Sequence, residues 1–187
     1  MLIAAFAAAL LAQIPAAPAQ DGPISTAGGA TETAAQVRLR EALAYSNPLP
    51  RGAPSEDYPL VAWCDALVSG HVRLGETLTD RNAEDLEIMR LGRLEASDFR
   101  SALAAAAPRQ SAAARTAATQ AAAAATARWT PLIAQPDEAA RSQSFGLFFG
   151  LPGRCEHAAR RIRANITTPP ATLDDVGLRS EGVDPVQ

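Results

Sequence analysis

The chain contains no lysine, so arginine supplies all seventeen of its basic residues. Together with the heavy use of alanine, we interpret this bias as a reflection of genomic base composition rather than as a binding signature. Twenty acidic residues outnumber the arginines and leave a formal net charge of −3. A nucleic-acid-binding domain usually carries a basic excess, so the charge balance predicts no nucleic-acid partner.

Aromatic residues are also scarce, at 5% of the chain. A core must therefore be built mainly from alanine, leucine and valine. Burial of apolar surface contributes about 25 cal/mol per Å², and these small side chains each bury little area. Runs of alternating β-branched residues and glycine-bounded strand patterns are missing as well. Their absence predicts an all-α fold, in its simplest form an up-and-down helical bundle of about four longer helices with one or two short ones.

The first twenty residues carry no charged side chain and are rich in apolar ones. The apolar run from Leu2 to Ala12 is too short to span a bilayer, which takes about 20 residues, and Ala17–Ala19 is typical of a cleavage site. Residues 1–19 are thus predicted to be a signal peptide, although the usual basic residue near the start is missing. The chain would then be periplasmic or secreted, with no stable membrane span after cleavage. A buried N-terminal helix of a cytosolic protein is the alternative.

One helical domain is predicted at residues 32–166, between a flexible linker at 20–31 and an unstructured tail at 167–187. The linker is rich in glycine, serine and threonine, and the tail is rich in proline and glycine. Periodicity and helix-breaking residues predict helical segments at approximately 32–45, 57–78, 84–107, 109–132, 137–151 and 154–166. In the first segment one side is apolar and consists of Ala35, Leu39, Ala42 and Leu43.

The two cysteines, Cys64 and Cys155, fall on the apolar faces of their predicted helices. An exported protein with an even number of cysteines usually pairs them, so the sequence predicts a disulfide between Cys64 and Cys155. In the chain-entropy description, closing such a long loop stabilises the fold by about 4–5 kcal/mol. Two buried free thiols or one reactive thiol are the alternatives.

The chain lacks the sequence patterns of common catalytic and cofactor sites. It contains no G-x-S-x-G elbow, C-x-x-C pair, haem-attachment motif, phosphate-binding loop or H-E-x-x-H helix. Cys64 and His71 would lie about 10 Å apart along one helix and cannot both bind a single zinc ion. Acidic residues Glu84, Asp85 and Glu87 are interpreted as the solvated first turns of a helix. The sequence therefore predicts no enzyme, no metal site and no cofactor.

An aromatic cluster is formed by Phe145, Phe148 and Phe149. At i, i+3 and i+4 these residues share one helical face, and in a domain poor in aromatics this face is predicted to turn inward as core. The alternative is a ligand or partner surface beside the arginines of the following helix, among them Arg154 and Arg161. Such an arginine run is more often a solvated face.

The segment Asp57–Cys64 (DYPLVAWC), preceded by Gly52–Pro54 (GAP), resembles a stretch in uncharacterised exported, alanine-rich helical proteins of proteobacteria. The resemblance covers a short part of the chain and implies export and helical structure, with no activity attached. We therefore expect an exported, non-enzymatic domain that acts through protein contacts with a partner in the cell envelope. A bundle that binds a small apolar or anionic ligand beside Phe145–Leu151 is the alternative.

Overall fold

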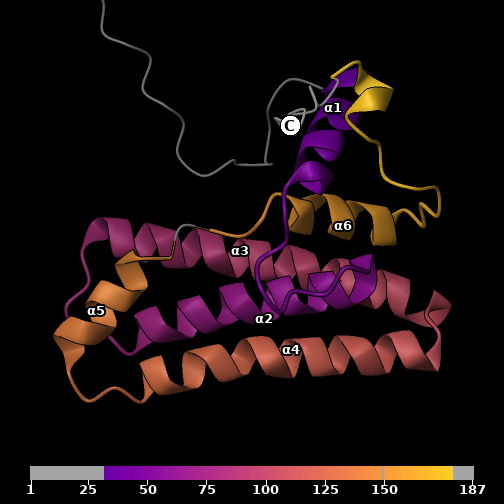
Figure 1. Cartoon of the computed structure of the whole chain (residues 1–187). Helices are drawn as coiled ribbons and strands as arrows, with labels where there is room; N and C mark the ends of the chain where they lie inside the picture. The colour runs from indigo at the N-terminus through magenta and orange to yellow at the C-terminus, as the bar shows by residue number, and fades with distance from the viewer. Residues whose placement is uncertain (1–31, 149, 179–187) are drawn as a thin grey trace, which may run out of the picture. The chain divides into compact units, whose positions relative to one another are not determined.

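The computed structural model describes residues 32–148 and 150–178 of the chain. The predicted signal peptide at 1–19, the linker at 20–31 and residues 179–187 of the predicted tail lie outside these ranges, and so does Phe149. All regular structure in the described ranges is helical, which confirms the predicted all-α bundle (Figure 1). In chain order the elements are α1 (Ala34–Ser46), α2 (Asp57–Glu76), α3 (Ala83–Ala106), the 3₁₀ helix η1 (Ala107–Arg109), α4 (Ala112–Ile133), α5 (Glu138–Gly146), α6 (Arg154–Arg163) and the 3₁₀ helix η2 (Asp174–Val176).

Local sequence signals account for where several of these helices begin. Asn82 starts α3 in a capping box with Asp85, so the acidic first turn predicted for this helix also caps it. Ser111 and Asp137 accept backbone hydrogen bonds at the starts of α4 and α5. The start of α2 has no side-chain cap, because Asp57 is its first helical residue and its carboxylate accepts from Arg161 instead.

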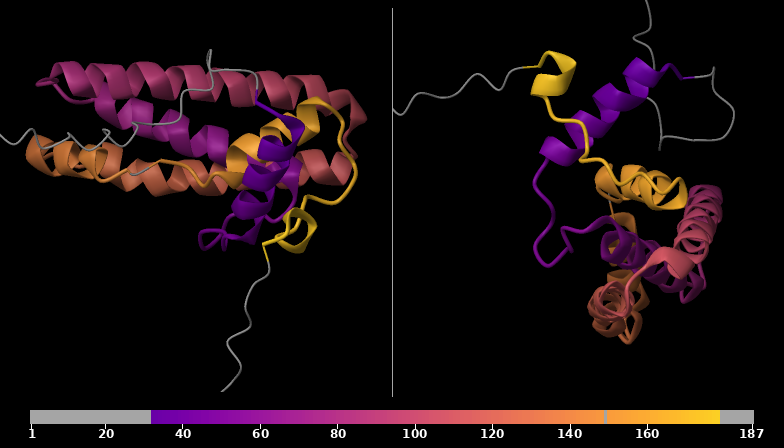
Figure 2. Two further views of the ribbon diagram at one scale, coloured as in Figure 1. Left: turned by 90° about the horizontal axis from the view of Figure 1, so that it is seen from above. Right: turned by 90° about the vertical axis from the view of Figure 1, so that its right-hand side faces the viewer.

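α2 is the central helix of the bundle. Thirteen of its twenty residues are buried, and they lie on all sides of the helix rather than along one stripe. α3 and α4 flank α2, as the end-on view in Figure 2 shows, and α6 packs against both α2 and α3. The three long helices, α2, α3 and α4, have 20, 24 and 22 residues, and α1, α5 and α6 are shorter.

α4 packs mainly on α2 and runs in the same direction. Pro59 and Ala114, near the starts of the two helices, line a small hollow at that end of the helix pair. Gly70 and Trp129 lie against each other nearer the helix ends. A Cβ atom at Gly70 would lie only 2.0 Å from Trp129 Cδ1, so glycine is required for this approach. α3, on the other side of α2, runs in the opposite direction and connects the two parallel helices. The buried stripe of α4 consists of Ala118, Ala121, Ala125 and Trp129.

A disulfide joins α2 to α6. Cys64 and Cys155 lie 91 residues apart in sequence, and their Cα atoms are 6.1 Å apart. Both residues are buried in the core. The pairing is the one predicted from the sequence. Among the described helices, none combines the length and the hydropathy that a membrane span requires.

Part of the predicted unstructured tail, residues 167–178, has a defined conformation and packs through η2 against α1. Thr172 and Asp175 exchange hydrogen bonds at the start of η2. Gly177 ends η2 with a φ of 76°, a conformation that favours glycine. The difference from the expectation has a local cause, because a Thr-x-x-Asp capping pattern and a terminal glycine form a short helix inside a segment of tail-like composition.

Candidate functional site

The predicted aromatic cluster surrounds a buried histidine. His71 of α2 packs on Phe145 and on Phe148, with 4.4 Å between ring centroids in both pairs. Phe145, near the end of α5, is 3% exposed, and Phe148 is partly buried just beyond that helix. The structure therefore places Phe145 in the core and packs Phe148 against it, while Phe149 lies outside the described residues. The prediction of one shared helical face is wrong for Phe148, because α5 ends at Gly146 rather than at residue 151.

One hydrogen bond sets the orientation of the His71 ring. Its Nε2–H donates to the backbone oxygen of Phe145 over 2.9 Å, at the end of α5, where the Phe148 N–H also donates to this oxygen over 3.4 Å. Burial lowers the pKa of His71, and the bond to the carbonyl opposes that shift only in part. The neutral imidazole is thus a polar link between α2 and α5 inside an apolar cluster.

Arg161 of α6 is buried, which corrects the expectation of a solvated arginine face at this position. It is 4% exposed. Nε donates to Asp57 Oδ2 over 2.9 Å, Nη1 donates to Glu41 Oε1 over 3.1 Å, and Nη2 donates to the carbonyl of Thr168. Burial alone would lower the pKa of Arg161, but the two carboxylates raise it. Arg161 therefore links α1, α2, α6 and the segment that leads to η2.

Tyr45, near the end of α1, brings Arg154 and Arg161 together. Its hydroxyl donates to Asp57 Oδ1 over 2.6 Å, and burial together with this bond raises the pKa of Tyr45. The guanidinium of Arg154 lies 4.3 Å from the centroid of the Tyr45 ring, and that of Arg161 lies 5.9 Å from it. Arg154 also donates to the carbonyl of Ser55 over 2.7 Å. The two arginines predicted for a binding surface thus fasten α1 to α6 and α2.

These arginines and the phenylalanines occupy different parts of the structure. Phe145 and Phe148 lie where α5 meets α2, whereas Arg154 and Arg161 lie where α6 meets α1. A hollow of about 280 Å³ between α2 and α4 has none of these four residues in its lining. Within residues 32–148 and 150–178, no group of three or more His, Cys, Asp and Glu side chains is placed to hold a metal ion.

α1 turns its charged side toward the domain. Glu41 is buried and forms ion pairs with Arg160 and Arg161, both at 3.1 Å. Arg40 lies 3.7 Å from Glu156 of α6. An amphipathic helix ordinarily does the opposite and buries its apolar stripe. The ion pairs therefore determine which side of α1 faces the core.

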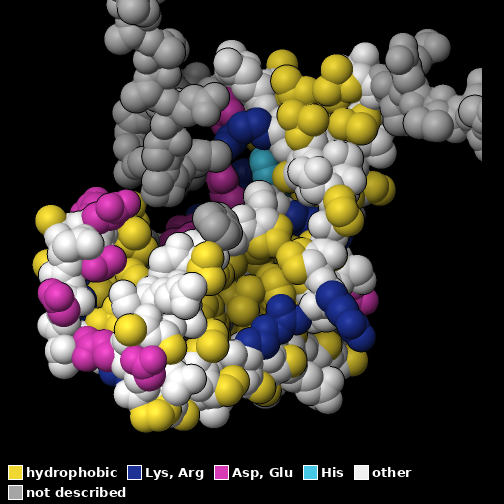
Figure 3. Space-filling model, turned by 60° about the vertical axis from the view of Figure 1, so that its left-hand side comes forward, with side chains coloured by type: hydrophobic (Ala, Val, Ile, Leu, Met, Phe, Trp, Pro, Cys, Tyr) yellow, Lys and Arg dark blue, Asp and Glu magenta, His cyan; other side chains and the backbone are white. Residues whose placement is uncertain are grey.

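The apolar side of α1 faces solvent as a result. Leu39 and Leu43 are 37% and 44% exposed, and of the four residues predicted to form an apolar side only Ala42 is buried. Ala35, Leu39 and Leu43, at i, i+4 and i+8, line up along the helix, and we call them the outward stripe. Figure 3 shows hydrophobic side chains gathered in the upper part of the molecule, where α1 and η2 lie.

Three residues of this region, Glu41, Tyr45 and Asp57, have roles that sequence reasoning missed. An aspartate at a helix start, such as Asp57, ordinarily serves as a cap or as a first-turn acid, so its binding of Arg161 is not visible in the sequence. Glu41 directly precedes the apolar segment ALAY (residues 42–45) of α1, and this position was the available signal. The signal is weak, since an isolated glutamate on a helix is usually solvated.

Comparison of the chain with protein-family models, with curated proteins and with solved structures gave no match. Two features call for an explanation beyond the packing of the domain: the outward stripe of α1 and the hollow between α2 and α4.

Proposed function

We propose that this chain is a non-enzymatic protein-binding domain that acts in the cell envelope, outside the cytoplasm. It docks a protein partner through the outward stripe of α1. The observation that carries the proposal is the orientation of α1, whose charged side is tied to the domain while Leu39 and Leu43 face solvent. Apolar surface held outward in this way is typical of an interaction site.

The anchoring of α1 keeps the outward stripe exposed. Rotating α1 to bury Leu39 and Leu43 would separate Glu41 from Arg161 and would leave buried charges without partners. Full burial of a leucine side chain contributes about 1.5–3 kcal/mol. A partner that covers the exposed fraction of the two leucines would therefore gain about 1 kcal/mol from each.

The spacing of the outward stripe indicates how the partner binds it. Anchors at i, i+4 and i+8 fit an apolar groove that accepts one helix lengthwise. Arg38, next to Leu39 in sequence, has an exposed side chain with Asp175 3.9 Å away. We therefore expect the partner's groove to have an acidic rim, which would compete with Asp175 for Arg38.

The disulfide supports the location of the domain. Disulfides persist in the periplasm and outside cells, and they are rare in the cytoplasm. The Cys64–Cys155 bond holds α6 on α2, and α6 carries Arg160 and Arg161, to which α1 is tied. An oxidising compartment would therefore maintain the framework on which α1 is presented.

Site-specific crosslinking in the native cell tests the docking surface. A photoreactive amino acid at position 43 should yield one discrete protein adduct, and the same residue at the exposed position Thr119 of α4 should yield none. Leu39→Gln should reduce the adduct at position 43 and leave the thermal midpoint unchanged, because Leu39 is not core. Equal adducts at positions 43 and 119, or a lowered midpoint for Leu39→Gln, would contradict the proposal.

The location is tested by the intact mass of the protein from the periplasmic fraction. Cleavage after Ala19 predicts a mature chain that begins at Gln20. Recovery of the full-length chain from the cytosol alone would show that the domain is not exported.

A further inference from the structure

The hollow between α2 and α4 is built from an apolar floor and a polar rim. Ala66 and Gly70 of α2 and Trp129 and Ile133 of α4 supply apolar surface. The rim contains one charged side chain, Arg73, together with the hydroxyl residues Ser69, Thr126 and Thr130. Its volume of about 280 Å³ is close to the lower limit of typical small-molecule sites, which is about 300 Å³.

Trp129 contributes an unused hydrogen-bond donor beside this floor. The residue is 6% exposed, and its Nε1–H is buried with no acceptor among the described groups. The pyrrole edge of the indole, including Nε1, lies directly against Gly70. A buried donor without a partner is unfavourable by about 1–3 kcal/mol, so an acceptor oxygen that reaches it would be stabilising.

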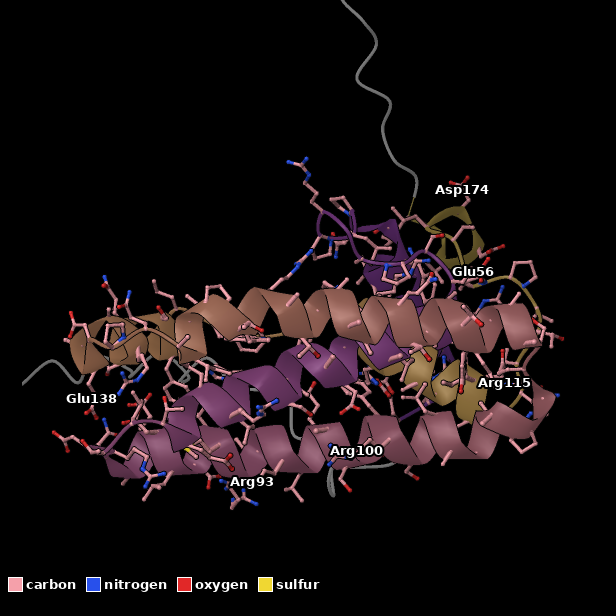
Figure 4. The ribbon with its side chains drawn as sticks, turned by 90° about the horizontal axis from the view of Figure 1, so that it is seen from below. Glu56, Arg93, Arg100, Arg115, Glu138 and Asp174 are labelled. Carbon is pink, nitrogen blue, oxygen red and sulfur yellow. A yellow bond between two sulfur atoms is a disulfide. The ribbon has the colours of Figure 1, made fainter. Side chains whose placement is uncertain are left out.

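The charges along this side of α2 are paired except for one. Asp65 lies 3.5 Å from Arg100, and Glu76 lies 2.9 Å from Arg93, both arginines belonging to α3. Figure 4 shows Arg93 and Arg100 along α3, with α2 between α3 and α4. Arg73 forms no ion pair within the described part of the chain.

α4 adds no charge to the lining of the hollow. Between residues 116 and 127 it carries only alanine, threonine and glutamine. Arg128, the next charged residue, donates instead to the carbonyl of Arg51 and lies over the ring of Trp63. The hollow is therefore apolar inside and has a single unpaired positive charge at its rim.

We propose that this hollow binds a small organic carboxylate with an apolar body. The carboxylate binds the guanidinium of Arg73, whose planar fork fits two carboxylate oxygens. The apolar body lies over Ala66 and Gly70 against Trp129 and Ile133, and an oxygen substituent that reaches the floor would accept from Trp129 Nε1. This site is distinct from the outward stripe and from the aromatic cluster around His71.

Benzoate is a suitable probe, since it combines a carboxylate with a flat apolar ring. The chain has two tryptophans, so a ¹⁵N-labelled sample gives two indole N–H resonances, one of which reports on the floor of the hollow. Benzoate at millimolar concentration should shift the Trp129 resonance saturably and leave that of Trp63 in place. Benzylamine, which has the same ring and a positive charge, should not shift it.

Variants separate binding at the hollow from non-specific effects. Arg73→Gln should weaken benzoate binding at least about tenfold, because the ion pair is lost while the apolar floor remains. Ala66→Leu should abolish binding by filling the hollow while Arg73 is retained. Arg115→Gln, on an exposed part of α4 outside the lining, should bind like the parent.

Three results would overturn the proposal. They are no saturable shift with benzoate, an equal affinity in Arg73→Gln, and an equal response to benzylamine. The indole spectrum of each variant without ligand shows whether the variant is folded. If Arg73→Gln is misfolded, Arg73→Lys takes its place. That substitution keeps the charge but loses the fork, so intermediate affinity is expected.

Discussion

Replacing Arg161 by methionine tests whether the buried ion pairs hold α1 on the domain. Methionine keeps an unbranched side chain of similar length and removes the guanidinium. Glu41 would retain Arg160 at 3.1 Å, and Asp57 would retain the Tyr45 hydroxyl at 2.6 Å. Removing one partner of a buried pair usually costs about 3–5 kcal/mol. Because each carboxylate keeps one partner, we expect a loss of about 2–3 kcal/mol in the free energy of unfolding.

Two measurements together give the size and the location of this loss. Urea denaturation followed by circular dichroism reports the global free energy of unfolding, and amide hydrogen exchange reports each helix separately. Since α1 packs mainly on α6 and η2, the amides of α1 should lose more protection than those of α2 in Arg161→Met. Loss of α1 would also remove the surface that carries Leu39 and Leu43.

Arg163→Met is the matched control, because Arg163 is on the same helix but exposed, where it pairs with Asp98 at 2.6 Å. An exposed pair contributes about 0–1 kcal/mol, so this variant should be close to the parent in stability. If Arg161→Met were as stable as Arg163→Met, or if protection in α1 were unchanged, the buried network would not be what holds α1.

Three further predictions concern the core. Phe148→Ala should lower the free energy of unfolding by about 2–3 kcal/mol. The loss is smaller than for a fully buried phenylalanine, because Phe148 is only partly buried. A thermal midpoint close to that of the parent would contradict the packing of Phe148 on His71. Replacing Cys64 and Cys155 by alanine should cost up to about 4–5 kcal/mol in urea denaturation, since the bond closes a long loop. Burial lowers the pKa of His71 and of His157 in the folded state. The unfolded state therefore binds more protons than the folded state at acidic pH. Stability should fall as the pH decreases below the histidine pKa of the unfolded chain, which is about 6.5. His71→Gln should flatten this dependence between pH 7 and 5, and an unchanged slope would show that His71 does not contribute.

The approximate helix starts and the disulfide could be predicted because their causes are local or periodic, whereas α5 ends at Gly146 rather than at residue 151. Asn82, Ser111 and Asp137 supply caps within three residues of the groups that they bind. Cys64 and Cys155 each fall on the apolar face of a helix, so burial of those faces brings them into one core. The all-α fold follows from the same periodicity, since no alternating pattern competes with it.

Which face of a helix packs against which neighbouring helix depends on contacts between residues that are distant in sequence. Glu41 and Arg161 are 120 residues apart, and neither position alone indicates that the other will neutralise it in the core. Because of this pairing, the charged side of α1 faces the core and Leu39 and Leu43 remain exposed. The pairing also buries an arginine that the local pattern assigned to solvent. The close packing of α4 along α2 likewise depends on Gly70 meeting Trp129, a steric fit that exists only once the two helices are side by side.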